Sequence, residues 1–228
     1  AIHGIANALT AYNDHNAPAQ RPKILQRLRQ GARLALVSDA GTPLISDPGY
    51  KLVREARDEG LPVFAVPGPS AVLAALSIAG LPSDQFFFSG FLPPKAGERQ
   101  NALQQLRDIP ATLIFFEAAP RLAATLSAMS VILGEREAAI ARELTKLHEE
   151  VRRGRLAELA EYYGSAAPPK GEIVILIGPP EKSGARASVN ADSLLRQALA
   201  HMPVSAAAAL VADATGENRR TLYDRALA

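Results

Sequence analysis

The sequence contains no cysteine and no tryptophan, and aromatic residues make up only 5% of its 228 positions. Without cysteine, disulfide bonds, thiolate nucleophiles and cysteine-based zinc sites are excluded, and this composition fits a reducing compartment. The scarcity of aromatic residues means that the core has to be built from aliphatic side chains and alanine. Because 48% of the residues are hydrophobic and 21% are charged, we expect an ordinary globular protein with a substantial core.

Long hydrophobic runs and a strong charge of one sign are also missing. No stretch approaches the roughly 18 consecutive apolar residues of a membrane span. The opening residues, AIHGIANALTAYNDHN, lack the basic start and long apolar middle of a signal peptide. The net charge of +2 is too small to indicate a nucleic-acid partner by itself. We therefore expect a cytoplasmic protein with no membrane partner.

Several common catalytic motifs are absent. The sequence has no GxxxxGK[ST], GxGxxG or GxSxG pattern, so phosphate-loop, dinucleotide-binding and serine-hydrolase functions lose their usual support. Of its four histidines, His148 lies in the charged segment ARELTKLHEE and the other three are isolated, and none shows HxxxH or HExxH spacing. Metal-dependent hydrolysis is therefore not indicated, and we expect no metal site.

The N-terminal half follows a pattern typical of parallel βαβ units. RPKILQRLRQG predicts a helix ending at Gly31, and RLALVSD a buried strand ending at Asp39. After a polar loop, YKLVREARDEG predicts a helix and LPVFAV a second strand. The turn PGPS then leads into the helix AVLAALSIAG, with Ser70 as its N-cap. Strand, loop, helix, strand, turn and helix together indicate an α/β fold.

The sequence changes character near GLPSD at residues 80–84, where we place a domain boundary. The expected order beyond it is strand, helix, strand, helix, strand, helix and strand, from QFFFSGFL to GEIVILIG. Residues 179–190 have the composition of a linker, and residues 190–228 predict three short helices. The expected organisation is an N-terminal α/β domain (1–83), a C-terminal α/β domain (84–180) and a helical tail (190–228).

The stretch VSDAGTPLISDPGY at residues 37–50 is too polar and too rich in turn-forming residues to be core. Asp39 lies at the carboxyl end of a predicted parallel strand, the edge where α/β sheets bind ligands. Gly41 permits close approach to the backbone, and Pro43 and Pro48 stiffen the loop. The loop is therefore a candidate binding loop. The alternative is a simple connection whose carboxylates cap the next helix.

Three further segments follow predicted strands. PGPS at residues 67–70 would line the same cleft as the preceding loop, although a plain turn and N-cap explains it as well. FFEAAPR places Glu117 four residues before Arg121, so a local ion pair is the alternative to a catalytic role. ARELTKLHEE at residues 141–150 could line a cleft or form a solvated charged surface.

Two basic clusters stand out. One runs from Arg21 to Arg33 without an acidic residue, and the other comprises Arg152, Arg153 and Arg155 beside Glu149 and Glu150. A solvated helix face is the usual explanation of such a cluster, and a phosphate-binding patch is the alternative.

Taken together and in order, these segments resemble the tetrapyrrole-methylase superfamily of S-adenosylmethionine-dependent methyltransferases. Within it they are most similar to the small-subunit ribosomal RNA methyltransferase I family, which methylates the ribose 2′-oxygen of a cytidine in 16S rRNA. The resemblance covers nearly the whole chain and rests on six segments: LVSDAGTPLISDPG, VPGPSA, GLPSDQFFFSGFLPPK, FFEAAPR, ARELTKLHEE and KGEIVILI. The family pattern starts with a further strand, a loop and an acidic segment, which this sequence does not show. The resemblance implies that this further segment supplies the first strand and part of the cofactor cleft.

The resemblance implies a two-domain tetrapyrrole-methylase-like α/β fold with a small helical C-terminal appendage, S-adenosylmethionine as cofactor, rRNA or the assembled small ribosomal subunit as partner, and a homodimer. It implies cofactor contacts, largely through main-chain groups, at Ser38, Asp39, Ala40, Gly41, Thr42, Ile45, Pro67, Gly68, Ser70 and Glu117. The end of GEIVILIG is expected to add to them.

Methyl transfer needs an aligned acceptor, exclusion of water, and a base or cation near the acceptor oxygen. The candidates for the catalytic groups are Glu117, Arg121, Glu143 and Lys146, and the sequence does not choose among them. The candidate RNA contacts are Arg27, Arg29, Arg152, Arg153, Arg219 and Arg220. Two other functions remain open: methylation of a precorrin-type tetrapyrrole, and RNA binding without catalysis.

Overall fold

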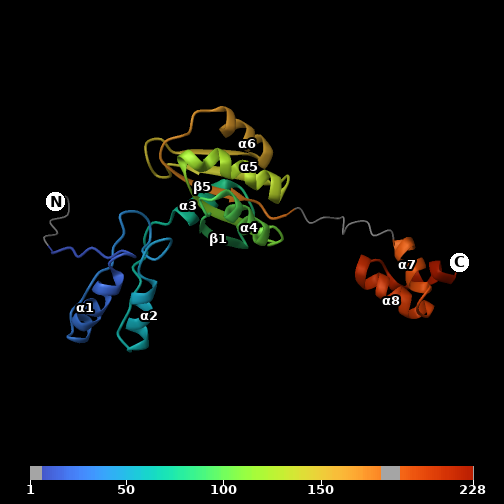
Figure 1. Ribbon diagram of the computed structural model, residues 1–228, viewed down its shortest axis with the longest axis horizontal. Helices are drawn as coiled ribbons and strands as arrows, with labels where there is room; N and C mark the ends of the chain where they lie inside the picture. Colours follow the sequence, from blue (N-terminus) through green and yellow to red (C-terminus); the bar gives the residue numbers. More distant parts are fainter. Residues whose placement is uncertain (1–6, 181–190, 228) are drawn as a thin grey trace. The chain divides into compact units, whose positions relative to one another are not determined.

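The computed structural model describes residues 7–180 and 191–227 (Figure 1). Contacts between residues divide the chain into two compact units, residues 1–179 and residues 180–228, each with its own hydrophobic core. The predicted boundary near residues 80–84 falls inside the first unit and stays a prediction. Most of the expected linker, residues 181–190, lies outside the described residues. No helix of the described residues is long and apolar enough to span a bilayer.

A five-stranded mixed sheet is the centre of the first unit. Its strands are β1 (Phe86–Phe91), β2 (Thr112–Ala118), β3 (Glu137–Arg142), β4 (Glu150–Arg155) and β5 (Glu172–Ile177), in the order β1-β2-β5-β3-β4. β1 and β2 are parallel, and the other neighbours are antiparallel. The parallel pair is interrupted by a bulge between Phe88 and Gly90.

Helices cover both faces of the sheet. α4 (Ala96–Leu106), α5 (Leu122–Leu133) and α6 (Leu156–Ser165) bury one face, and α3 (Ala71–Ala79) packs against the other (Figure 1). The short helix η1 (Ala119–Arg121) connects β2 to α5. Side chains alternate along each strand, so successive residues of β2 enter the two cores in turn. This aliphatic core, almost without large aromatic residues, agrees with the composition.

The first two helices form a smaller lobe. The helices are α1 (Ala17–Arg29) and α2 (Tyr50–Asp58), and their shared core has three buried residues: Leu25, Leu52 and Ala56. A few half-buried apolar side chains pack against this core. Two ion pairs join the helices, Arg21 to Glu55 at 2.8 Å and Arg29 to Glu59 at 2.5 Å. The acidic side of α2 therefore neutralises part of the basic cluster of α1.

Two of the predicted strands do not form. Residues 33–38 and 61–69 run mostly without regular secondary structure and pair with no strand of the described residues. Several of their apolar side chains are exposed to solvent, and Phe64 is 86% exposed. A strand needs a hydrogen-bonding partner, and the described residues supply none. The predicted helices that flank these runs are confirmed.

A third difference concerns the second basic cluster. The helix face given as the usual explanation of this cluster is wrong, because all three arginines lie on β4, the edge strand beside β3: Arg152, Arg153 and Arg155. The sequence EVRRGR contains one apolar residue, Val151, which packs on the α3 side of the sheet. Charged edge strands are common because charge discourages pairing with other chains.

The second unit consists of α7 (Ala191–Leu199), α8 (Val204–Thr215) and α9 (Arg219–Leu227), which confirms the three predicted helices. Small side chains of α7 and α8 pack around Leu222 of α9. Arg225 binds Asp192 at 3.1 Å and also binds Glu217, so one cation ties the two ends of this unit together.

Candidate functional site

The loop at residues 38–49 has an unusual backbone. Leu44 and Ser46 adopt left-handed conformations, with φ of 73° and 58°. Such conformations are costly for residues other than glycine and cluster at functional loops. The Ser38 hydroxyl donates a hydrogen bond to Asp47 and closes the base of the loop. The loop is thus held in one shape by its own side chains.

This loop is in direct contact with the PGPS turn. The Thr42 hydroxyl donates a 2.8 Å hydrogen bond to the carbonyl of Pro69. Ser70 accepts a hydrogen bond from the Leu73 amide and is the N-cap of α3, as predicted. The two segments that the sequence places in one cleft therefore meet at Thr42.

A glycine of β1 approaches the same loop. A Cβ atom on Gly90 would lie 3.1 Å from the Ser46 hydroxyl oxygen, and Gly90 itself has a φ of 69°. It sits at the bulge of the parallel pair, a feature that is frequent beside active sites. Gly90 was not among the predicted site residues, although a lone glycine inside a strand pattern is a signal of close backbone approach.

Glu117 does not face the two loops. It follows Leu113 and Phe115 on the face covered by α5, and it is only 3% exposed. Its carboxylate accepts hydrogen bonds from the Thr125 hydroxyl at 2.6 Å and the Ala118 amide at 2.7 Å, and pairs with Arg121 at 3.2 Å.

Arg121 also donates to the carbonyl of Leu92 at 2.7 Å. The ion pair considered as the alternative in the sequence is therefore formed, and it links β2 to the segment after β1. A catalytic or cofactor-binding role for Glu117 and Arg121 stays a prediction.

The turn after β3 brings Glu143 and Lys146 together. Lys146 donates to Glu143 at 2.9 Å and to Glu172 at 3.1 Å. Glu143 also accepts a 2.9 Å hydrogen bond from the Glu172 amide. Glu143 and Thr145 have positive φ angles of 50° and 65°, so this turn shares the strained backbone of the 38–49 loop.

These contacts set the charge states in the turn. The Glu172 amide and then Lys146 lower the pKa of Glu143 from its ordinary 4.5. Glu143 and then Glu172 raise the pKa of Lys146 from its ordinary 10.5. Glu143 is thus a weak base at neutral pH, and Lys146 is a fixed cation.

The six arginines proposed for RNA contact fall into three groups. Arg27 is exposed on α1, whereas Arg29 is paired with Glu59. On β4, Arg152 lies 3.9 Å from the centre of the Tyr162 ring, and Arg153 donates to the Gly80 carbonyl at 2.9 Å.

Arg219 and Arg220 form the third group and begin α9 in the tail, beside an open hollow lined also by Ser205 and Tyr223. The structure leaves the RNA role of all six arginines a prediction. Among the described residues, no group of three or more histidine or acidic side chains is arranged to hold a metal ion.

Comparison with known proteins gives the family. Residues 6–160 match the model of tetrapyrrole (corrin/porphyrin) methylases. The chain belongs to this family. Residues 185–228 match a second model, described as the RsmI C-terminal HTH domain.

Curated relatives of this tetrapyrrole methylase are similar over almost its whole length. A protein of Mesorhizobium japonicum is 53% identical over 99% of this chain and 76% of its own. One of Pseudomonas aeruginosa is 46% identical over 98% of this chain and 81% of its own. Both carry the name ribosomal RNA small subunit methyltransferase I.

Solved structures confirm the tetrapyrrole-methylase fold. Diphthine synthase matches with a TM-score of 0.55 and 15% identity, over 73% of this chain and 68% of its own. Uroporphyrin-III C-methyl transferase from Thermus thermophilus, complexed with S-adenyl homocysteine, matches with a TM-score of 0.50 and 21% identity, over 73% and 75%. The predicted fold, with its helical appendage, is confirmed.

Proposed function

We propose that this protein is an S-adenosylmethionine-dependent methyltransferase that methylates small-subunit ribosomal RNA, and that the acceptor is the 2′-oxygen of a cytidine ribose. The similarity at 53% and 46% identity to proteins named ribosomal RNA small subunit methyltransferase I, over nearly the whole chain, carries this proposal. The match of the tail to a domain of the same family supports it. A cytoplasmic location and a homodimer belong to the same proposal.

The loops fit the cofactor. Gly41 has open space around the position of a Cβ atom, and Gly68 has only a backbone oxygen at 3.9 Å. A ligand can therefore approach the main chain of both loops closely. Residues 38–42, Ile45 and 67–70 would hold the cofactor, and the bond from Thr42 to Pro69 would fix their spacing.

S-adenosylmethionine, when bound, supplies a methyl group that its sulfonium has already activated. The protein has to orient the acceptor hydroxyl, whose proton would pass to solvent as the oxygen bonds to the methyl carbon and the bond from that carbon to sulfur breaks. It also has to stabilise the negative charge that the oxygen acquires as it loses this proton. Of the four candidate groups, Lys146 suits the second task, because it is a half-exposed cation, whereas Arg121 is paired with the buried carboxylate of Glu117. Glu143 then positions Lys146, whereas Glu117 and Arg121 hold the end of β2 in place.

A transfer assay with the full chain tests the function. Radiolabelled methyl transfer should be seen with small ribosomal subunits or their rRNA, but not with a precorrin-type tetrapyrrole, and nucleoside analysis should yield 2′-O-methylcytidine. Calorimetry with S-adenosylmethionine separates a catalyst from an RNA-binding protein without activity. Transfer only to the tetrapyrrole, or no cofactor binding, would contradict the proposal.

The role of Lys146 has a matched control. Lys95 binds Glu98 at 2.9 Å with the same three-residue separation as Lys146 and Glu143. We expect Lys146→Met to lower the transfer rate about 100-fold with unchanged cofactor affinity, since it removes one charge-stabilising donor. Lys95→Met should stay within about twofold of wild type. A wild-type rate for Lys146→Met would remove Lys146 from catalysis.

A further inference from the structure

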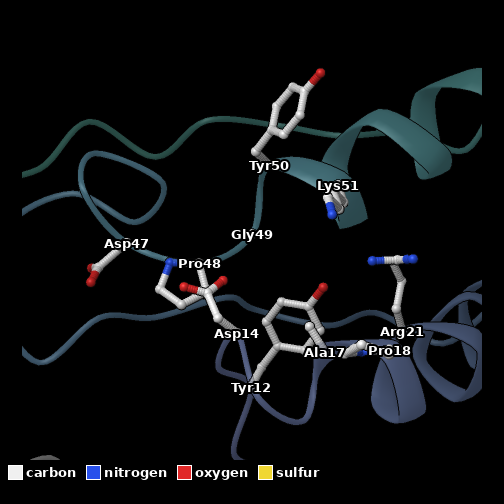
Figure 2. Close-up of a pocket in the computed structure, with 10 residues that line it drawn as sticks. All are labelled: Tyr12, Asp14, Ala17, Pro18, Arg21, Asp47, Pro48, Gly49, Tyr50 and Lys51. Carbon is white, nitrogen blue, oxygen red and sulfur yellow. The ribbon is translucent and has the colours of Figure 1, made fainter.

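A cavity of about 180 Å³ lies where α1 and α2 begin, next to the end of the 38–49 loop (Figure 2). Its lining includes Tyr12, Asp14, Arg21, Pro48 and Lys51. Pockets for drug-sized ligands are usually roughly 300–1,000 Å³, so this one suits a single small ring. None of the proposed cofactor contacts lines it, and neither does Glu143 or Lys146.

The walls of this cavity are fixed by contacts behind them. Gly49 is buried with a φ of 139°, and a Cβ atom there would lie 3.0 Å from Leu36 and 3.1 Å from Leu44, so only glycine fits. Asp47 is bound by Ser38 and Arg21 by Glu55. In Figure 2 the Asp47 carboxylate and the Tyr50 ring are directed away from the other lining side chains.

The groups that remain for a ligand are of mixed kind. Figure 2 shows the Tyr12 hydroxyl and the ends of Arg21 and Lys51 around one space, with Asp14 beside Pro48. No hydrogen bond or ion pair within the described ranges occupies the side chains of Asp14 or Lys51. The cavity thus offers a free acceptor, a free donor, a phenol and apolar walls.

This balance of charge disfavours a phosphate. Asp14 would face the anion, and the charge of Arg21 is already matched by Glu55. A neutral flat ring with donors and acceptors on its edge suits the site better. Cytosine has this chemistry, because a carboxylate accepts from its exocyclic amino group and a cation donates to its acceptors. Single-stranded RNA is read in this way, by unstacked bases placed in small pockets.

We propose that this cavity receives an unstacked pyrimidine base of the RNA substrate, with cytosine preferred through Asp14 and Lys51. The proposal rests on the proposed function and names a specificity site for it. The site shares a loop with the proposed cofactor contacts, because the bond from Ser38 to Asp47 joins the two ends of that loop. A base held here and a cofactor held at residues 38–42 would thus be positioned by the same loop.

The test is a change of base preference. Binding of the labelled RNA oligomers rC12, rU12 and rA12 to the full chain is measured by fluorescence anisotropy. Wild type should bind rC12 about tenfold more tightly than rA12, a discrimination within the range of one good base contact. Asp14→Asn should weaken rC12 about tenfold but leave rU12 unchanged or tighter, because an amide can donate to the O4 of uracil. Lys51→Met should weaken both pyrimidine oligomers.

Two exposed residues outside the cavity supply matched controls. Asp58→Asn on α2 and Lys95→Met at the N-cap of α4 should change no affinity by more than about twofold. S-adenosylmethionine affinity should stay at the wild-type value in all four variants, which shows that each one is folded.

Three results would overturn the inference: equal affinity of wild type for all oligomers, an equal loss for all of them in Lys51→Met, or no effect of Asp14→Asn. The second result would indicate a phosphate contact instead. If wild type methylates small-subunit rRNA while the variants keep its base preference, only the cavity assignment fails. If wild type prefers rC12 but transfers no methyl group to rRNA, the proposed function fails and the cavity assignment stands.

Discussion

Similar apolar sequences adopt different structures in the sheet of the first unit and in the α1–α2 lobe. TLIFFEA becomes β2 and buries Phe115 completely, whereas LPVFAV stays unpaired and leaves Phe64 86% exposed. Both runs are rich in residues that favour strands. The difference lies in their neighbours, because β2 has a strand on each side and residues 61–66 have none among those described. An apolar run can form a strand, but it does so only where a neighbouring strand forms hydrogen bonds with its backbone.

The comparison predicts its largest effect at two phenylalanines. Phe115→Ala should destabilise the protein by about 3–5 kcal/mol, because it leaves a cavity in the main core. Phe64→Ala should change the free energy of unfolding by less than about 0.5 kcal/mol, because that side chain is already in solvent. Urea denaturation followed by circular dichroism measures both.

An equal loss of stability in Phe64→Ala and Phe115→Ala would contradict this prediction. If Phe64→Ala costs as much as Phe115→Ala, residues 61–66 are buried against a partner in solution. A methyl-transfer assay on Phe64→Ala then shows whether that burial matters for activity. Concentration dependence of the unfolding midpoint would indicate a second copy of the chain as the partner.

The helices and four of the five strands in the sheet are predicted from the sequence for a physical reason. Their signals are local: a hydrophobic period, a capping serine at position 70, a glycine at position 80. β4 was missed because its sequence, EVRRGR, has little apolar character. It is a strand because its backbone pairs with that of β3, and this pairing cannot be recognised from the local sequence.

The candidate site also has features that the sequence predicts and contacts that it does not predict. The contact between the 38–49 loop and the PGPS turn was predicted from two preceding strands that do not form, and the hydrogen bond from Thr42 to Pro69 makes it instead. The approach of Gly90 to Ser46, and of Gly171 to Glu143, joins residues far apart in the chain. The burial of Glu117 was foreseeable, since it alternates with Phe115 and Leu113 on one face of β2.

A second pair of variants compares the same kind of bond in the two regions. Thr125 donates to Glu117 inside the core, and Ser38 donates to Asp47 in the 38–49 loop. Thr125→Val should cost about 1–3 kcal/mol, because it removes a partner from a buried carboxylate. Ser38→Ala should cost less than about 1 kcal/mol, because water can replace the lost bond.

Thermal unfolding at pH 7 measures both variants, and Thr112→Val provides a further reference. Thr112 is fully buried and donates to the Pro82 carbonyl at 2.5 Å, so its loss also removes a buried bond but spares Glu117. A cost for Ser38→Ala equal to that of Thr125→Val would mean that the 38–49 loop is as well shielded as the core.

The smallest effect is expected at the exposed turn after β3, and it depends on pH. The pKa of Glu143 is lowered in the folded state by the Glu172 amide and Lys146, so folding favours its ionised form. This contribution to stability is fully present above the ordinary pKa of 4.5 and is lost as the pH falls through the lowered value. Glu143→Gln should therefore lower the urea midpoint slightly at pH 7 and not at all once wild-type Glu143 is itself protonated.

Glu161→Gln is the control for this titration, because it removes an exposed carboxylate on α6, away from the turn after β3. The difference between Glu143→Gln and wild type should also shrink in high salt, since exposed ion pairs are screened. A penalty for Glu143→Gln that persists unchanged below the lowered pKa would mean that the Glu143 side chain stabilises the turn by its hydrogen bonds rather than by its charge. Glu143 would then hold Lys146 in place by geometry alone, and the turn would behave like the buried core rather than like the exposed loop.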